Sequence, residues 1–297
     1  MEKLLEVVLP VALIVMAGYA AGRAIEIDLQ TLSRVSVYLL VPALIFDAML
    51  NAELTSSSVV GIWGAFFLSS LLVYLVTLLL ARAGHLPASI AKTLVASAAF
   101  PNSGNMGLAL SQFAFGKTGL ELGVVFFIAS SILMFGLGPA YFRGGGFLQS
   151  LVFTLRLPLF WSLFAGLVLR FTGWSIPFNL GEGIHLLGQA AIPLMLATLG
   201  MQIAKTKPQW GGFELTASTL RLGLSPLAAF LVAKLIGLGP LETSVLVLQS
   251  AMPIAVNAFL MAQEFGGDAA RAARAVVASS VLSFATIPLL LWLLRVG

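Results

Sequence analysis

The sequence predicts an all-α membrane protein of ten transmembrane helices. These form two inverted five-helix repeats, in which helices 4 and 9 are broken and cross at the midplane. The first observation is composition: of 297 residues, 59% are hydrophobic and 9% charged, whereas soluble domains carry about a quarter charged residues. The second is a series of apolar runs of about twenty residues, the length that crosses a bilayer core. The third is a spacing of prolines that repeats at half the chain length.

Charges, Pro/Gly clusters and span length together place the ten helices in order. The first run contains Pro10 and Gly18, which belong to the repeat, so we expect a retained helix and not a cleaved signal peptide. The expected helices are 4–22, 30–50, 59–81, 90–115, 119–141, 148–170, 183–203, 213–237, 241–265 and 269–294.

The composition also excludes several classes of function. A GxxxxGK[ST] phosphate loop is absent, which argues against ATP-driven pumping. The chain has no cysteine, so it can form no disulfide or thiolate metal site. It shows no Ser/His/Asp set and no His/Glu cluster with metal-ligand spacing, so we expect no enzyme, cofactor or metal. The net charge of +4 does not indicate nucleic-acid binding, because basic residues of membrane proteins mark loops on one side.

The distribution of Lys and Arg predicts the orientation in the cell (inner) membrane. With ten helices both termini lie on one side, which collects five basic residues against eleven on the other. The positive-inside rule therefore places both termini outside, in the periplasm. Arg221 falls inside the eighth helix; if that helix starts as an interfacial stretch around Glu214, Arg221 is expected to snorkel to the headgroups. The five outer basic residues are Lys3, Lys117, Arg170, Lys234 and Arg295.

Five pairs of prolines, each separated by 148 to 153 residues, indicate an internal repeat. The pairs are Pro10 and Pro158, Pro42 and Pro193, Pro87 and Pro240, Pro101 and Pro253, and Pro139 and Pro288. The sequence ASS at 129–131 recurs at 278–280, and Asn105 and Asn257 each follow their proline by four residues.

Five helices are an odd number, so the second repeat enters the membrane from the opposite side, as in many secondary transporters. The first repeat spans 1–143 and the second 147–297, joined by the short polar connector at 143–146. We expect the repeats to be intertwined in one domain.

The fourth helix carries a cluster of helix breakers near its centre. Pro101 removes a backbone donor, Gly104 and Gly107 permit unusual dihedral angles, and Asn102 or Ser103 is a natural N-cap for a restarted helix. The helix is therefore expected to stop just before Pro101 and restart just after it. The alternative is a plain proline kink, with the asparagines bonding neighbouring helices.

The ninth helix repeats the proline and the asparagine, as Pro253 and Asn257, but has no glycine, so a mere kink is a stronger alternative here. If both helices break and cross, their restarted N-termini point into one space, where about half a positive charge at each favours an anion. The opposing C-terminal ends offer carbonyls that could hold a cation. No Lys or Arg lies near the middle of either helix. The expected substrate-binding residues are Asn102, Ser103, Gly104, Asn105 and Asn257.

Three polar residues are weaker candidates for ion or proton coupling. Asp47 lies on the second helix close to Glu53, so an interfacial carboxylate is an equal interpretation. Gln249 and Gln263 lie inside spans, where interhelical hydrogen bonding is the alternative role.

Several motifs resemble those of the auxin efflux carrier family, which includes bacterial malate and malonate carriers. They are VPALIF at 41–46, PNSGNMG at 101–107, LPL at 157–159, IPL at 192–194 with LG at 199–200, and AMP at 251–253 with NA at 257–258. The resemblance implies ten helices, a scaffold domain, a transport domain containing the crossed helices, and transport of small organic anions. In the family the crossover asparagine contacts the substrate carboxylate; here that role falls on Asn102 or Asn105, and the choice stays open.

The expected function is a secondary active transporter for small carboxylates, working by alternating access. One alternative is a sodium-coupled symporter of the bile-acid type, with Gln249, Asn257 and Gln263 as candidate Na⁺ ligands. Another class is a receptor that does not transport, or a membrane-embedded enzyme acting on lipid. The expected partners are a small organic anion, H⁺ or Na⁺, and the lipid bilayer, without nucleic acid. A homodimer is left open.

Overall fold

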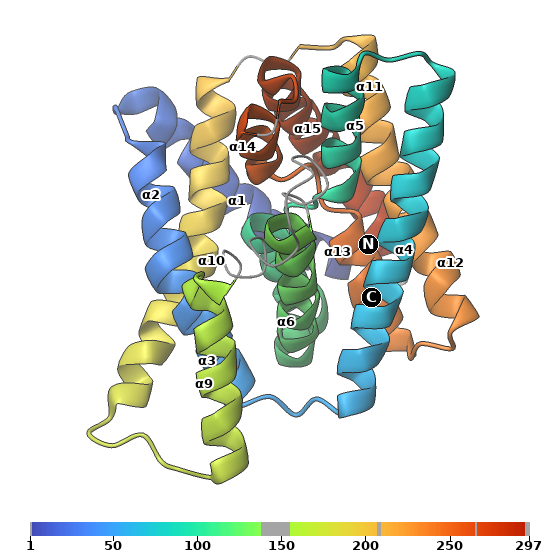
Figure 1. Ribbon diagram of the computed structural model, residues 1–297. Coiled ribbons are helices and arrows are strands. Elements are labelled where there is room, and N and C mark those ends of the chain that lie inside the picture. The colour runs from blue at the N-terminus through green and yellow to red at the C-terminus, as the bar shows by residue number, and fades with distance from the viewer. Residues whose placement is uncertain (1, 138–154, 207–208, 265, 295–297) are drawn as a thin grey trace.

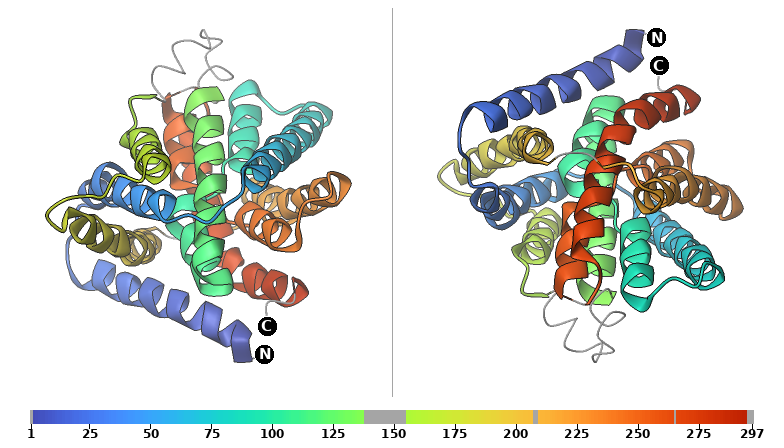
Figure 2. Two further views of the ribbon diagram at one scale, coloured as in Figure 1. Left: turned by 90° about the horizontal axis from the view of Figure 1, so that it is seen from below. Right: turned by 90° about the horizontal axis from the view of Figure 1, so that it is seen from above.

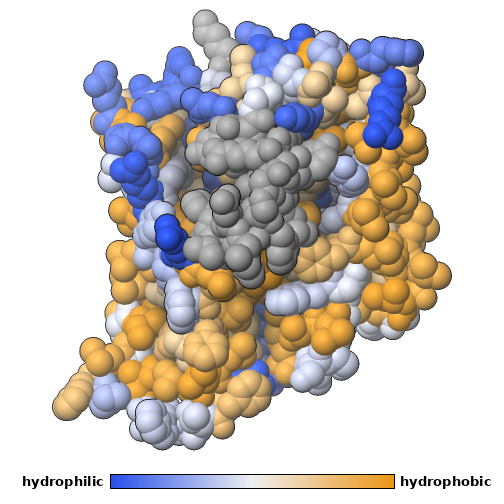
Figure 3. All heavy atoms as spheres, in the orientation of Figure 1, coloured by the Kyte–Doolittle hydropathy of each residue, from blue (hydrophilic) through white to orange (hydrophobic). Residues whose placement is uncertain are grey.

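The computed structural model describes residues 2–137, 155–206, 209–264 and 266–294, and these ranges form helices and connecting segments without a β-strand (Figure 1). Within these ranges, seven helical stretches are long and apolar enough to cross a membrane, and α5 (Ala88–Ala99) and α9 (Pro158–Thr172) are shorter apolar helices. In the coloured part of Figure 3, hydrophobic side chains cover most of the lower and right-hand face, and hydrophilic ones gather at the top, where α2 (Leu29–Val35), α5 and α11 (Gly212–Thr219) begin. The chain is therefore an all-helical, multi-pass membrane protein.

The elements of the first half, including turns of π-helix (η), largely follow the expected spans. They are α1 (Glu2–Ala24), α2 (Leu29–Val35), η1 (Ser36–Leu40), α3 (Val41–Leu50), α4 (Ser56–Ala83), α5 (Ala88–Ala99), η2 (Ser103–Gly107), α6 (Leu108–Ser131) and η3 (Ile132–Leu137). Within α6, Gly116 has a φ of +67° and a ψ of −154°, so the chain leaves helical geometry at the junction expected between the fourth and fifth helices.

The second half is described from residue 155. Its elements are α9 (Pro158–Thr172), α10 (Leu180–Lys205), α11 (Gly212–Thr219), η4 (Leu220–Leu224), α12 (Ser225–Leu235), α13 (Pro240–Ser250), α14 (Val256–Glu264) and α15 (Ala269–Leu293). Pro139, the connector at 143–146 and the expected start of the sixth helix at 148 lie outside the described residues.

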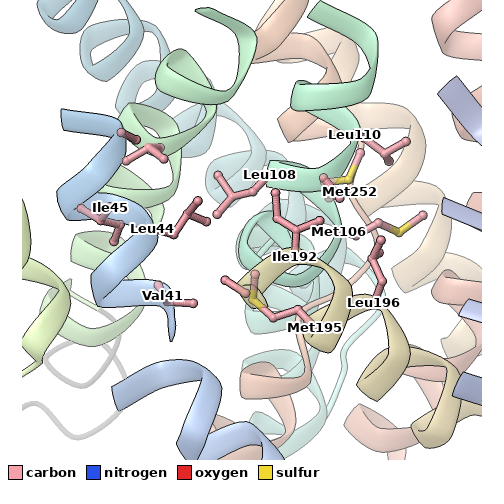
Figure 4. Close-up of a cluster of buried hydrophobic side chains, with 14 of the residues drawn as sticks. Val41, Leu44, Ile45, Met106, Leu108, Leu110, Ile192, Met195, Leu196 and Met252 are labelled. Atoms are coloured by element: carbon pink, nitrogen blue, oxygen red, sulfur yellow. The ribbon is translucent and has the colours of Figure 1, made fainter. Parts of the chain in front are cut away.

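The helices pack as two groups. The α10 group consists of α1, α2, η1, α3, α9 and α10; the crossover group consists of α4, α5, η2, α6 and α11 to α15. Figure 2 shows α3, α9 and α10 on one side of α6 and α4, α5 and α12 on the other. A buried apolar cluster joins the groups, with Ile192 and Leu196 of α10 facing Met106 and Leu108 of the crossover group (Figure 4).

Glycines allow α1 and α10 to approach each other closely. A Cβ atom on Gly18 would overlap the carbonyl oxygen of Ala197, and one on Gly200 would overlap that of Val15. Because lipid provides no hydrophobic force between helices, such small-residue contacts are a main source of packing energy in membranes. The α1–α10 contact therefore depends on these glycines.

Gly200→Ala is expected to destabilise the protein, because the added methyl group meets backbone and forces the two helices apart. Overpacking of this kind costs about 1–3 kcal/mol, which should appear as a lower midpoint of thermal unfolding in detergent. The matched control is Gly64→Ala on α4, where an added Cβ meets no atom within 4 Å. Equal midpoints for the two variants would contradict the assigned packing.

Candidate functional site

The helices expected to break at Pro101 and Pro253 are both broken. α5 ends at Ala99 and α13 ends at Ser250, and each is followed by a non-helical segment that contains the proline. Phe100 is extended, with φ −104° and ψ 99°, because a residue before proline is pushed out of the α region. The break predicted in the fourth helix is present, and so is the one in the ninth helix, although that helix has no glycine.

The two non-helical segments pair with each other. The amide of Asn102 donates to the carbonyl of Pro253 at 2.8 Å, and the amide of Ala255 donates to the carbonyl of Phe100 at 2.9 Å. Pro101 and Ile254 thus face each other across an isolated antiparallel bridge. Backbone at membrane depth must be satisfied within the protein, and each break supplies partners for the other.

The repeated ASS motif supports both breaks with hydroxyl groups. The Ser103 and Ser130 hydroxyls are hydrogen-bonded at 2.8 Å. On the other side, the amide of Ile254 donates to Oγ of Ser279 at 3.0 Å. Ser130 and Ser279 occupy corresponding positions of the motif, so one sequence feature holds the two breaks.

We call the two paired segments, 100–102 and 253–255, the crossover. A cavity of about 120 Å³ lies between the crossover and the α10 group. It is smaller than the roughly 300–1,000 Å³ of pockets for drug-sized ligands, so it suits a small molecule. The cavity is lined by residues that the sequence predicted for the site: Pro101, Asn102, Ser103, Gly104, Asn105 and Asn257. The α2–η1–α3 stretch and α10 contribute polar residues that were not among the expected substrate-binding residues: Ser33, Ser36, Thr198 and Gln202.

Two buried polar atoms of cavity-lining residues lack partners within the described parts of the chain. Nδ2 of Asn102 is one, on a side chain that is 4% exposed, and Oε1 of Gln202 is the other. Asn102 occupies the N-cap position of η2 but makes no capping hydrogen bond with its side chain. Because buried polar groups are nearly always paired, these two atoms are candidate contacts for a ligand. Asn105 also lines the cavity and is partly exposed.

The electrostatic character of the cavity comes from helix ends. No residue described in its lining carries a formal charge. The restarted helices begin at Ser103 and Val256, and both residues are part of the wall. Helix N-termini carry free N–H groups and about half a positive charge each, so the arrangement favours an anion.

The three candidates for ion coupling do not line this cavity. Asp47 of α3 is hydrogen-bonded to Nδ1 of His185 of α10 at 2.9 Å. Gln249 is fully buried behind the crossover; its Nε2 donates to Ser111 Oγ at 3.0 Å and its Oε1 has no partner among the described residues. Gln263 is exposed near the end of α14. Thus the structure does not bring these three residues together.

The expectation that Arg221 snorkels to the headgroups is wrong. Its side chain is 3% exposed and donates to the backbone carbonyls of Ala98 and Ser250. The described residues contain no group of three or more His, Cys, Asp or Glu that could hold a metal ion. The carbonyl contacts of Arg221 and the place of Gln202 at the cavity were not predicted; for Arg221 the signal was a charge inside an apolar span.

Comparison with known proteins gives a consistent result. Residues 3–146 and 147–292 match a family model described as "Membrane transport protein". An "Uncharacterized transporter" of Methanothermobacter thermautotrophicus is 30% identical, with 96% of each chain covered. A "Putative malonate transporter" of Rhizobium meliloti is 27% identical over 100% of this chain and 98% of its own. The "Uncharacterized transporter YfdV" of Escherichia coli is 25% identical over 97% and 96%, respectively.

Proposed function

Because the chain belongs to the membrane transport protein family, that of the auxin efflux carriers, we propose that it is a secondary active carrier of small organic anions. The family membership makes it a transporter and not an enzyme. The observation that carries the anion assignment is Nδ2 of Asn102, which has no partner among the described residues and lies beside two helix N-termini in a cavity whose described lining carries no formal charge.

We infer that the chain contains ten membrane-crossing helices in two inverted repeats, 1–143 and 147–297. The packing supports this inference, because equivalent helices have equivalent neighbours. α1 packs on α10 as α9 packs on α3, and α4 packs on α5 as α12 packs on α13. In each comparison, both helices of the first contact are replaced by their counterparts from the other expected repeat.

The place of the cavity supports alternating access. Its wall comes from the α10 group on one side and from the crossover group on the other. A rocking movement of one group against the other would open the cavity to each side of the membrane in turn, as inverted-repeat carriers do. By the positive-inside rule, the end that carries α2, α5 and α11 faces the cytoplasm, which leaves both termini outside.

The carboxylate class is supported by the chemistry of the wall. A carboxylate moved into an apolar site is costly unless donors compensate it, and the wall offers amide groups, hydroxyls and free backbone N–H groups. The relative from Rhizobium meliloti is named a malonate transporter, so a dicarboxylate of that size is the first compound to test.

The test combines binding with flux on purified protein. Malonate, malate and acetate are compared with organic cations for their ability to raise the unfolding temperature, because a ligand that binds only the folded state stabilises it. Labelled forms of the binding compounds are then followed into liposomes. We expect a carboxylate to bind and to cross.

Three other outcomes would contradict the proposal. Stabilisation by organic cations alone would exclude the anion site. Carboxylate binding without flux would indicate a receptor. Chemical conversion of a lipid in the same liposomes would indicate a membrane-embedded enzyme.

A further inference from the structure

Arg221 is a buried cation in the crossover group. It lies in η4, is 3% exposed, and pairs with no carboxylate among the described residues. A cation in such a place is costly unless its charge is balanced and its donors are used; of these donors, Nε has no partner among the described residues. Something other than an acidic side chain must therefore compensate the guanidinium.

The compensation comes from the C-terminal ends of α5 and α13. Nη1 of Arg221 donates to the carbonyl of Ala98 at 2.6 Å, and Nη2 donates to the carbonyl of Ser250. Ala98 lies in the last turn of α5, and Ser250 is the last residue of α13. The two acceptors correspond in the repeat, because each precedes its proline by three residues.

These two carbonyls lack their helical partners because the breaks divert them; the carbonyl of Ala98 also accepts from the Ser225 hydroxyl, at 3.4 Å. The residue three positions later is a proline in both cases and has no N–H group. The donors four positions later are used elsewhere: the amide of Asn102 donates to Pro253, and that of Ile254 donates to Ser279. The planar fork of an arginine, with several donors in fixed directions, can satisfy two converging carbonyls at once.

The charges balance as well. Each helix C-terminus carries about half a negative charge, so the two ends together match one guanidinium, which stays protonated. The C-terminal side of the crossover is then neutral, and the positive N-terminal ends on the cavity side are left for an anion. Two backbone carbonyls thus contact the guanidinium of Arg221 in the way that carbonyl oxygens contact a bound metal ion.

We propose that Arg221 is a built-in cation that takes the place of a coupling ion at the C-terminal ends of α5 and α13. The anion is therefore carried without Na⁺ at the crossover. This inference rests on the proposed function. The space beside Arg221 is a cavity of about 10 Å³, the lower limit for one water molecule, so a hydrated metal ion does not fit beside the guanidinium.

The first test uses the unmodified protein. Binding and liposome flux of malonate, or of whichever carboxylate binds best, are measured in sodium chloride and in choline chloride. We expect the same affinity and the same flux in both salts. A requirement for Na⁺ would overturn the proposal and would favour a sodium-coupled symporter.

The second test removes the cation. Arg221→Ala is expected to weaken carboxylate binding by about tenfold or more in choline chloride, because two helix ends are left unbalanced (1.4 kcal/mol per tenfold). Millimolar guanidinium should restore binding, since it can donate to both carbonyls. The control is Arg274→Ala, which removes an arginine paired with Glu214 at 2.7 Å and 32% exposed; it should show neither loss nor rescue. Wild-type affinity in Arg221→Ala would overturn the proposal.

A readout without substrate separates this inference from the proposed function. Guanidinium should raise the unfolding temperature of ligand-free Arg221→Ala and not that of the unmodified protein. If no carboxylate binds at all, the proposed function fails while this measurement still decides the role of Arg221. Should Arg221→Ala not fold, Arg221→Lys keeps the charge but not the fork. It should fold with a lowered unfolding temperature, and an unchanged temperature would contradict the two-carbonyl contact.

Discussion

Asn102→Ala is expected to lower carboxylate affinity by about ten- to a hundredfold while leaving the protein folded. The side chain is buried and its Nδ2 has no partner in the described structure, so a bound anion is the acceptor that it lacks. A hydrogen bond to a charged group contributes about 1.5–3 kcal/mol, and each 1.4 kcal/mol is about tenfold in affinity. Titration of the unfolding temperature with malonate measures the loss.

A variant that introduces a negative charge makes this test sharper. Asn102→Asp should bind carboxylates more weakly than Asn102→Ala when the aspartate is ionised, because it sets like charge against the ligand. Gln112→Ala is the control, since Gln112 is exposed on α6 and does not line the cavity. Asn105→Ala and Asn257→Ala should lose less than Asn102→Ala, because these residues are only partly buried. Wild-type affinity in Asn102→Asp at neutral pH would exclude an anion at this position.

Pro101→Ala is expected to reduce transport by more than about tenfold, with near-normal expression. The new N–H group can bond the carbonyl four residues earlier and continue α5. Asn102 would then turn with the helix, and its amide would leave the carbonyl of Pro253, 2.8 Å away. Both the crossover bridge and the cavity wall depend on that geometry. Flux of a labelled carboxylate into liposomes measures the effect.

The matched control for this variant is Pro42→Ala. Pro42 lies in the first turn of α3, within a helical stretch that runs unbroken from residue 29 to 50. An alanine there adds a helical hydrogen bond without closing a break, so the loss should be mild. Equal losses in the two variants would mean that Pro101 only shapes packing.

The sequence predicted those features that depend on local chemistry. Hydropathy located the apolar helices, and Pro101 and Pro253 located both breaks, because a missing N–H group acts within one turn. Asn102, Asn105 and Asn257 could be placed at the cavity wall because the breaks carry them there. The structure places Asp47, Gln249 and Gln263 away from this wall, since spacing along the chain does not say which face of a helix meets which neighbour.

The contacts that the sequence did not predict are long-range ones. Arg221 contacts carbonyls that lie 123 and 29 residues away in the chain, and no local pattern encodes such a pairing. The same is true of Gln202, which reaches the cavity only because α10 packs beside the crossover. The expected snorkelling of Arg221 was inferred from one helix alone, without the two carbonyls that other helices present to it.

The reciprocal pairing of the two breaks sets an order of events during synthesis. Asn102 and Phe100 find their backbone partners in Pro253 and Ala255, which leave the ribosome about 150 residues later. At roughly 5–20 residues per second this interval is about 8 to 30 seconds. During that time the first break must sit in or near the bilayer with an unsatisfied amide and carbonyl, a costly state in lipid. The nascent first half therefore depends on the insertion machinery or on water at the interface until the second half arrives.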